Sequence, residues 1–233
     1  MRIELLKWDS DFLGIKTGRI FLNDENEWDE SELKNWDLVY IFVDPSDTST
    51  NLILQQKKVQ LVDEKVTYLM DVSILKEIKD NLSYVHSYFS SNKDSEVISI
   101  GIQSGIYSRF YIDPKFSKAK FKELYTIWMK KSIDRQIADE VIVYRTNKNE
   151  IAGVITLGEK NSNADIGIIA VDANFRGQNI GKTLIQEAIN YSIRKKYLSL
   201  QVVTQKNNAA ACKFYERCGF TEKDVINIYH YWK

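Results

Sequence analysis

The chain alternates between short apolar runs and longer stretches in which apolar residues recur at helical spacing. Runs rich in β-branched and aromatic residues, bounded by Asp, Asn, Gly or Pro, predict strands. In the first part of the chain such runs lie at 2–8, 17–22, 38–43 and 66–72. Polar stretches with spaced apolar residues, which predict short helices, lie at 27–35 and 48–57. Residues 1–90 are therefore predicted to form a mixed α/β unit.

The polar stretch 87–96 is the predicted boundary between this unit and a second one at 91–233. Residues 96–106 and 116–134 then have the apolar spacing of helices. Pro114 interrupts the helical pattern between them, because the residue before a proline is pushed toward an extended conformation.

From residue 140 the pattern predicts a sheet with helices between its strands. Residues 140–146 and 150–159 flank an Asn-Lys-Asn turn and predict a hairpin. The next strand, 164–172, is apolar at nearly every position, which predicts a strand covered on both faces. An amphipathic helix follows, and then come three further elements: a strand at 197–204, a helix at 207–218 and a strand at 225–232. The fold class is thus α/β, with a sheet flanked by helices.

A glycine-containing loop joins the apolar strand to the long helix. It reads Arg176-Gly177-Gln178-Asn179-Ile180-Gly181. Backbone N–H groups at a helix start bind anions such as phosphate, and Gly177 and Gly181 allow the backbone to approach an anion closely. Arg176 can add a charged fork. The loop lacks the three glycines of the dinucleotide fingerprint and the first glycine of a P-loop. Binding of a phosphate-bearing ligand is favoured over a helix start that binds nothing.

Charge and composition exclude several other classes of function. The 32 basic and 32 acidic side chains cancel, so no global field attracts nucleic acid or an anionic membrane. Cys212 and Cys218 with two distant histidines form no recognisable zinc set, so no metal is expected. The balanced charge therefore favours a small-molecule partner. The N-terminal residues carry no apolar signal core and no apolar run reaches spanning length, which predicts a cytosolic protein.

With its flanks, the loop resembles the GCN5-related N-acetyltransferase (GNAT) superfamily, whose acetyl-CoA pyrophosphate loop follows Arg/Gln-x-x-Gly-x-Gly/Ala. Arg176 and Gly181 match that pattern, and Asn179 replaces the middle glycine. Asn enters the left-handed region more readily than most residues, so this departure is tolerable. A second family mark, Asn-x-x-Ala-x-x-x-Tyr followed by Gly-Phe, runs from Asn208 to Phe220. The resemblance implies a GNAT fold with a mixed central sheet, and an acetyl-CoA-dependent N-acetyltransferase.

The resemblance also implies which residues bind acetyl-CoA. In the family the strand before the loop splays from its neighbour and pairs with the pantetheine arm. The residues implied to hold acetyl-CoA are Ile169, Ala170, Val171, Arg176, Gly177, Gln178, Asn179, Ile180, Gly181, Lys182 and Asn208.

Tyr215 of the second mark is the predicted general acid. The CoA thiolate that leaves when an amine attacks the thioester needs a proton, and a phenol with a pKa of about 10 can supply it. Packing under its helix is the alternative for this tyrosine. Asp165 resembles the position of a carboxylate that removes the amine proton in some family members. A solvated strand-end aspartate without that role is the alternative, since an amine arriving partly neutral needs no dedicated base.

Outside the CoA motifs the chain resembles bacterial dTDP-fucosamine acetyltransferases, which acetylate the amine of a nucleotide-linked 4-amino-4,6-dideoxy sugar. The likeness lies in Trp8 with 12–14, in 108–110 with Asp113, and in the tail 229–232. Arg109 is predicted to hold the diphosphate and Phe110 to stack on the base. The alternative is a loop whose Arg snorkels to the surface and whose Phe enters the core.

By the same resemblance, residues 1–90 form a partial GNAT-like copy without a phosphate loop, which covers the catalytic domain or builds a homodimer contact. Two other functions stay open. One is acetylation of another small amine, such as an amino acid, an antibiotic or a protein N-terminus. The other is a non-catalytic module that binds acyl-CoA, against which the presence of Tyr215 argues.

Overall fold

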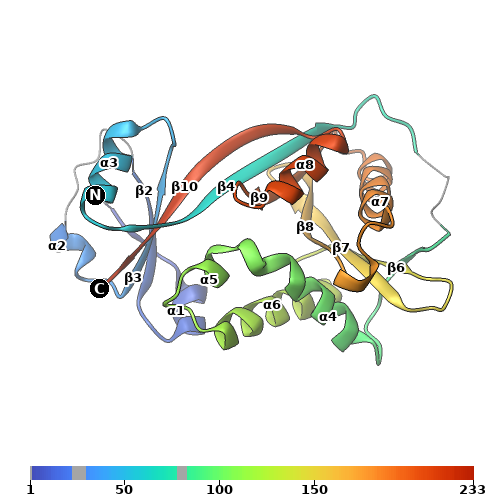
Figure 1. Cartoon of the computed structure of the whole chain (residues 1–233), viewed down its shortest axis with the longest axis horizontal. Helices are drawn as coiled ribbons and strands as arrows, with labels where there is room; N and C mark the ends of the chain where they lie inside the picture. The colour runs from blue at the N-terminus through green and yellow to red at the C-terminus, as the bar shows by residue number, and fades with distance from the viewer. Residues whose placement is uncertain (1, 23–29, 78–82) are drawn as a thin grey trace. The chain divides into compact units, whose positions relative to one another are not determined.

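The computed structural model describes residues 2–22, 30–77 and 83–233, and these residues form two compact units (Figure 1). The first unit takes Met1–Val66, Gln205–Asn207 and Asp224–Lys233, and the second takes Thr67–Thr204 and Asn208–Lys223. Strands β4 (Gln60–Asp71) and β10 (Thr221–Trp232) have residues in both units.

The first unit contains a small sheet with two helices packed against one face. Its strands follow the order β1-β2-β3-β10, in which β2 and β3 are parallel and the other pairs are antiparallel. Side chains from β2, β3, α2 and α3 form its core, among them Ile20, Ile41, Leu33 and Leu54. Apart from β4 and β10 its elements are β1 (Glu4–Leu5), α1 (Lys7–Leu13), β2 (Thr17–Leu22), α2 (Glu30–Leu33), β3 (Leu38–Val43) and α3 (Thr48–Gln56).

The strand predicted at 2–8 is wrong over most of its length. Only Glu4–Leu5 is a strand, and α1 begins at Lys7. Gly14 ends this helix in the left-handed conformation, with φ of 72°, and its N–H donates to the Ser10 carbonyl. The apolar residues Trp8 and Phe12 are four apart and stack at 5.2 Å, a helical contact that the short apolar run had concealed.

The second unit contains the glycine loop. Its strand order is β4-β9-β8-β7-β6-β5. Its helices are α4 (Asp94–Gln103), η1 (Ser104–Tyr107), α5 (Arg109–Ile112), α6 (Lys118–Ile133), η2 (Ala173–Phe175), α7 (Ile180–Arg194) and α8 (Ala209–Arg217). Its strands besides β4 and β10 are β5 (Val85–Ser87), β6 (Glu140–Arg145), β7 (Ile151–Lys160), β8 (Asn163–Val171) and β9 (Ser199–Gln205).

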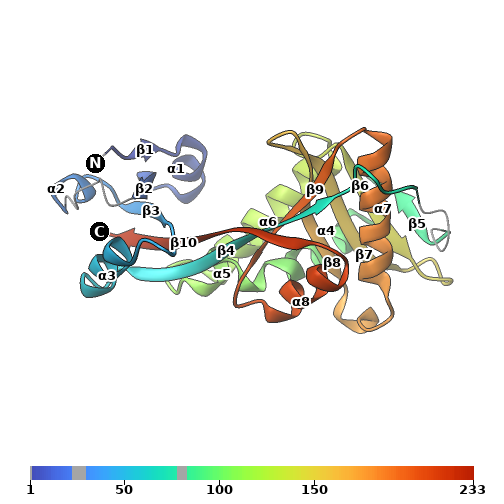
Figure 2. The ribbon, with the colours of Figure 1, turned by 90° about the horizontal axis from the view of Figure 1, so that it is seen from above.

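Helices cover both faces of the second unit's sheet. Val154 of β7 packs in one cluster with α4 and α6, whereas a Cβ at the neighbouring Gly153 would lie 3.0 Å from Ile180 of α7. Successive strand residues point to opposite faces, so α4 and α6 lie on one face and α7 on the other (Figure 2). The predicted α/β fold with a mixed sheet flanked by helices is confirmed.

The compact units do not follow the boundary predicted after residue 90. β10 pairs antiparallel with β3 from Asn227–Val43 to Trp232–Leu38, which brings the end of the chain into the first unit. Residues 67–77 and 83–90, by contrast, belong to the second unit. Pairing between strands far apart in sequence sets this division, and a polar stretch of sequence does not reveal it. No helix of the residues described above has the length and apolar character to cross a membrane; a cytosolic location stays a prediction.

Candidate functional site

The loop between β8 and α7 leaves the start of α7 open. Gly177 and Asn179 take positive φ values of 80° and 61°. Asn179 is the N-cap residue of α7, and its side chain makes no capping hydrogen bond. The first N–H groups of a helix have no partner within it, so those of Ile180 and Gly181 are directed outward and carry the positive end of the helix dipole. The expectation that Asn fits this left-handed position is confirmed.

The other loop residues surround this helix start. Arg176, Gly177, Gln178, Asn179 and Lys182 are exposed. The Arg176 Nε donates to the Val171 carbonyl at 3.2 Å, so this guanidinium lies beside the end of β8. A Cβ on Gly181 would lie 3.1 Å from the Phe214 ring and 3.8 Å from Val171, so glycine lets α8 and β8 approach the helix start closely. The exposed charges here are cationic, which suits an anionic ligand.

Strand β8 separates from β9 just before the loop. Their parallel pairing runs from Ala164–Leu200 to Ile166–Val202, although β8 continues to Val171 and β9 to Gln205. On its other side β8 stays paired with β7 to Val171, and the Asp172 N–H donates to the Ala152 carbonyl. Backbone groups of successive strand residues point to alternate sides, so those of Ile169 and Val171 point toward the side where the pairing with β9 has ended. The splayed strand expected from the resemblance is present.

The prediction that this strand is covered on both faces is wrong only toward the end of the strand. Ala164, Ile166 and Ala170 are buried, but Ile168, Ile169 and Val171 are half-buried. The side chains at the end of β8 are therefore only partly covered, beside the backbone edge that β9 no longer pairs.

Gln103, at the end of α4, holds the chain where β8 passes into the loop. Its Nε2 donates to Asp172 Oδ2 at 2.9 Å, and its Oε1 accepts from the Ala173 N–H at 3.1 Å. The hydrogen bond from Gln103, together with one from the Asn174 N–H, lowers the pKa of the Asp172 carboxyl below its ordinary value. The Gln103 amide thereby fixes both the Asp172 carboxylate and the Ala173 N–H, where the loop begins.

Tyr215 lies on α8 in an aromatic cluster and is only 5% exposed. Its ring lies 5.4 Å from Phe214 and 5.8 Å from both Tyr68 and Phe220. Burial raises the pKa of its phenol above the ordinary 10.0, with Cys212 and Cys218 as smaller causes. The phenol therefore keeps its proton at neutral pH, as a general acid requires. Asn208 caps the same helix, accepting from the Ala211 N–H at 3.2 Å.

Asp165 lies on β8 within the part that is still paired with β9. Gln201, its partner across the strands, donates to Asp165 Oδ1 at 2.7 Å. Gln201 in turn accepts from Asn163 at 3.4 Å. The carboxylate is half-buried and belongs to a row of neutral polar side chains, and its role as a base stays a prediction.

Arg109 and Phe110 begin the short helix α5. The Phe110 ring is 8% exposed and packs edge-on against Phe116 at 5.4 Å and Trp128 at 6.0 Å. That is the core position which the sequence left open as the alternative to base stacking. Arg109 is half-buried, and its guanidinium carbon lies 4.6 Å from the centre of the Phe110 ring.

The first unit has its own strand–loop–helix corner, from β3 to α3, with a different chemistry. Asp47 caps α3, and its side chain accepts from the Thr50 N–H at 2.9 Å. Asp44 in the same loop accepts from the Ser46 N–H at 2.8 Å. The start of α3 is thus capped by the chain's own Asp47 carboxylate.

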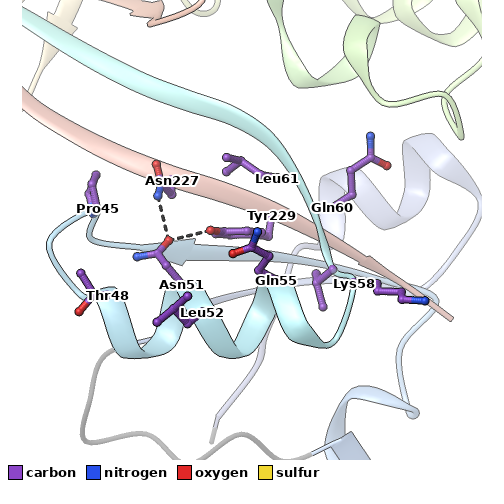
Figure 3. Close-up of a pocket in the computed structure, with 11 residues that line it drawn as sticks. Pro45, Thr48, Asn51, Leu52, Gln55, Lys58, Gln60, Leu61, Asn227 and Tyr229 are labelled. Atoms are coloured by element: carbon purple, nitrogen blue, oxygen red, sulfur yellow. Dashed lines mark hydrogen bonds between the residues drawn. The ribbon is translucent and has the colours of Figure 1, made fainter.

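A pocket of about 730 Å³ lies beside α3, lined by this helix, the start of β4 and β10 (Figure 3). Its central polar groups bond one another: Asn51 Oδ1 accepts from the Asn227 amide at 2.8 Å and from the Tyr229 hydroxyl at 2.7 Å. Lys58 is the cation among the lining residues. Asn51 also donates to the carbonyls of Asp44 and Asp47, which ties the pocket wall to the loop.

Residues 106–220, about half of the chain, match the Acetyltransferase (GNAT) family. The matched region contains the open helix start, the uncovered β8 edge and Tyr215. The chain is a member of the GNAT family. GNAT acetyltransferases use acetyl-CoA, and in the described part of the chain no group of three or more His, Cys, Asp or Glu could hold a metal ion.

Two curated relatives of this GNAT protein come from bacteria. It is 23% identical over 219 residues to a dTDP-fucosamine acetyltransferase of Escherichia coli O6:H1, a match that covers 93% of this chain and 92% of the relative. It is 25% identical over 140 residues to the spore coat polysaccharide biosynthesis protein SpsD of Bacillus subtilis, covering 60% of this chain. The match spans only 48% of the length of SpsD.

The GNAT fold is also seen in solved structures. A GCN5-related N-acetyltransferase from Sphaerobacter thermophilus superposes with a TM-score of 0.55 at 15% identity, covering 84% of this chain and 59% of that one. At this identity the likeness concerns the fold.

Two residues that shape this site were not among the predicted ones, namely Gln103 and Thr156, whose hydroxyl accepts from the Ile168 N–H at 2.8 Å. One signal in the sequence pointed to the second: Gly167 is an isolated glycine inside an apolar strand, a pattern typical of a β-bulge.

Proposed function

We propose that this GNAT enzyme transfers the acetyl group of acetyl-CoA to the amine of a nucleotide-linked amino-deoxy sugar. One observation carries the proposal: a strand edge that β9 no longer pairs is followed, through a short loop, by a helix start without a side-chain cap. An extended arm with amide groups, joined to a pyrophosphate, has the two kinds of group that these two features bind.

Each part of acetyl-CoA has matching residues in this proposal. The outward backbone groups of Ile169 and Val171 take the pantetheine amides, and Ala170 between them holds β8 against β7. The pyrophosphate is held by the N–H groups at the start of α7, with Arg176 and Lys182 as nearby cations. Asn208 contributes by fixing the start of α8.

The chemistry proposed is direct attack of the sugar amine on the thioester that acetyl-CoA supplies. Tyr215 gives its phenolic proton to the departing thiolate, and burial keeps that proton in place. Asp165 accepts the proton that the amine loses. The acid role has the stronger support, because the Asp165 carboxylate already accepts a hydrogen bond from Gln201.

The acceptor class is supported by the relatives and by one cation. The match to the enzyme named dTDP-fucosamine acetyltransferase extends over nearly the full length of both chains, and SpsD is named for polysaccharide biosynthesis. A nucleotide sugar carries a diphosphate, and Arg109 has a guanidinium fork that suits it. Phe110, packed between Phe116 and Trp128, then supports Arg109 from below instead of stacking on the base. Whether the first unit forms a homodimer contact stays a prediction.

Incubation with acetyl-CoA and a panel of amines tests the proposal. The panel contains dTDP-linked 4-amino-4,6-dideoxy sugars, free amino sugars, amino acids and streptothricin, and products are read by mass spectrometry. We expect a product heavier by one acetyl group only with the nucleotide-linked sugars. Turnover of a free amine alone contradicts the acceptor, and binding of acetyl-CoA without any turnover contradicts the enzyme.

The same assay tests Arg109. Arg109→Ala should raise the KM for the nucleotide sugar about tenfold or more, with acetyl-CoA affinity kept. Arg194→Ala is the matched control. Arg194 is an exposed arginine in the last turn of α7, away from the loop, and it forms a salt bridge with Glu187. Equal loss of both affinities in Arg109→Ala would show that α5 does not serve the acceptor.

A further inference from the structure

One residue of β8 has no pairing partner in β7. Thr156 of β7 opposes Ile168, and the next residue, Leu157, opposes Ile166, so Gly167 is the extra residue of a β-bulge. Bulges bend the strand that carries them. This bulge comes directly after Ile166, where the pairing of β8 with β9 ends. The bend thus coincides with the point at which the two strands separate.

A side chain holds this bulge. The Ile168 N–H donates to the hydroxyl oxygen of Thr156 at 2.8 Å, where a regular ladder would use a backbone carbonyl. Thr156 is 2% exposed, so the side chain that accepts this hydrogen bond is packed inside the sheet. Loss of the hydroxyl removes the partner of the Ile168 N–H, which makes the hydroxyl a constraint on the position of Ile168.

Gly167 leaves the space that the Thr156 hydroxyl occupies. A Cβ on residue 167 would lie 2.9 Å from Thr156 Oγ1, closer than such atoms approach in proteins. Glycine fits here because the threonine oxygen occupies the place that a Cβ would take. The two residues therefore act together: the hydroxyl on β7 lies against the Cα of a residue on β8 that has no side chain.

We propose that the Thr156 hydroxyl, seated against Gly167, is a positioning group that holds β8 away from β9 and so keeps the backbone edge of Ile169 and Val171 ready for the acyl-CoA arm. The inference rests on the proposed function, because the edge matters only if an extended ligand binds it. Neither residue touches the reacting atoms. A regular β8 would shift the following residues by one position, turning the faces of Ile168–Val171 over and removing this edge.

Three variants separate this role from ordinary core packing. Thr156→Val keeps the shape and loses the hydroxyl, whereas Thr156→Ser keeps the hydroxyl. Thr17→Val is the matched control, because Thr17 is a fully buried strand threonine in the first unit whose hydroxyl donates to the Ile15 carbonyl at 3.2 Å. Calorimetry gives the Kd for acetyl-CoA, and hydrogen exchange of the unliganded protein reports on the Ile168 amide.

We expect Thr156→Val to raise the Kd about tenfold and to speed exchange at Ile168, while Thr156→Ser and Thr17→Val stay within about twofold of the native Kd. Native affinity in Thr156→Val, or an equal loss in Thr17→Val, overturns the proposal. If Thr156→Val does not fold, Gly167→Ala replaces it, since its methyl group must displace the hydroxyl; native affinity in that variant overturns the proposal as well.

Failure of this inference is distinct from failure of the proposed function. If the native protein binds no acetyl-CoA, the proposed function is wrong. If it binds and the Ile168 amide exchanges equally in native protein and Thr156→Val, the positioning role alone is wrong.

Discussion

The two units each contain a strand that passes through a short loop into a helix, and the two loops treat the helix start in opposite ways. At the start of α3, Asp47 accepts from the Thr50 N–H and Asp44 lies in the same loop. At the start of α7, Asn179 offers no capping side chain and the nearby exposed charges are cations. One corner has an internal anion and the other has room for an external one.

The comparison teaches that a strand–loop–helix corner is not by itself an anion site. A helix start is favourable for negative charge in both units, but a carboxylate at the cap already satisfies that preference in the first. The left-handed residues make the second corner different, since φ of 80° at Gly177 and 61° at Asn179 turn the chain without using a capping side chain. The cap residue decides whether the anion comes from the chain or from a ligand.

The largest effect is expected where the first unit has no counterpart, at Tyr215. Tyr215→Phe keeps the ring in its cluster and removes the proton donor. We expect kcat to fall by about 10² to 10⁴-fold, with acetyl-CoA affinity close to native. Steady-state kinetics with calorimetry measures both. A more acidic leaving thiol should shrink the loss, since it needs less help from an acid.

Tyr191→Phe is the control for this substitution. Tyr191 is also a buried tyrosine of the second unit, and its hydroxyl donates to Asp139 at 2.7 Å. The Tyr191→Phe variant should lose stability and keep the native kcat.

The pH dependence of kcat gives a second test of Tyr215. Because burial raises the pKa of Tyr215 above 10.0, the acid form persists to higher pH, and kcat should show no loss from this phenol up to pH about 10. Near-native turnover of Tyr215→Phe under chemistry-limited conditions would remove the tyrosine from the mechanism.

The next largest effect is expected from Gly181→Val, which adds bulk at the open start of α7. In Gly181→Val the new side chain meets the Phe214 ring, where even a Cβ would be 3.1 Å away. We expect the Kd for acetyl-CoA to rise about a hundredfold, measured by calorimetry. Ser49→Val, at the second position of α3, is the matched change in the other corner and should leave that Kd unchanged. Unchanged affinity in Gly181→Val would show that the ligand does not use this helix start.

A smaller effect is expected from a substitution that makes the start of α7 resemble the self-capped start of α3. Asn179→Asp places a carboxylate at the start of α7, and Asp also enters the left-handed region readily. We expect the fold to be kept and acetyl-CoA affinity to fall about tenfold through repulsion of the pyrophosphate. Asn179→Gly, which adds no charge, should bind at least as well as the native chain. Equal affinities of the two variants would contradict an anion at this position.

The smallest effect is expected in the first unit. Asp47→Ala removes the cap of α3 and should lower the free energy of unfolding by about 1 kcal/mol, read from urea denaturation. Acetyl-CoA affinity should not change, because this corner is assigned no ligand. A change in that affinity would mean that the two corners are not functionally separate.

Local sequence determined the parts of the site that depend on neighbours in the chain. The apolar run, the glycine loop and the amphipathic helix predicted the β8–loop–α7 corner, and the second motif predicted the helix that carries Tyr215. The strands at 17–22 and 38–43 were predicted with their observed bounds. These features follow from backbone preferences and periodicity, which act over a few residues.

Tertiary structure alone decided how those parts are held. The Thr156 hydroxyl reaches an N–H that is 12 residues away, and Gln103 reaches Asp172 across 69 residues. The Phe110 ring took a core position against Trp128, and β10 joined β3. Periodicity tells which residues are apolar or helical, but not which distant partner a polar atom or a ring will meet. That choice depends on how the elements pack, and here it made the strand edge of β8.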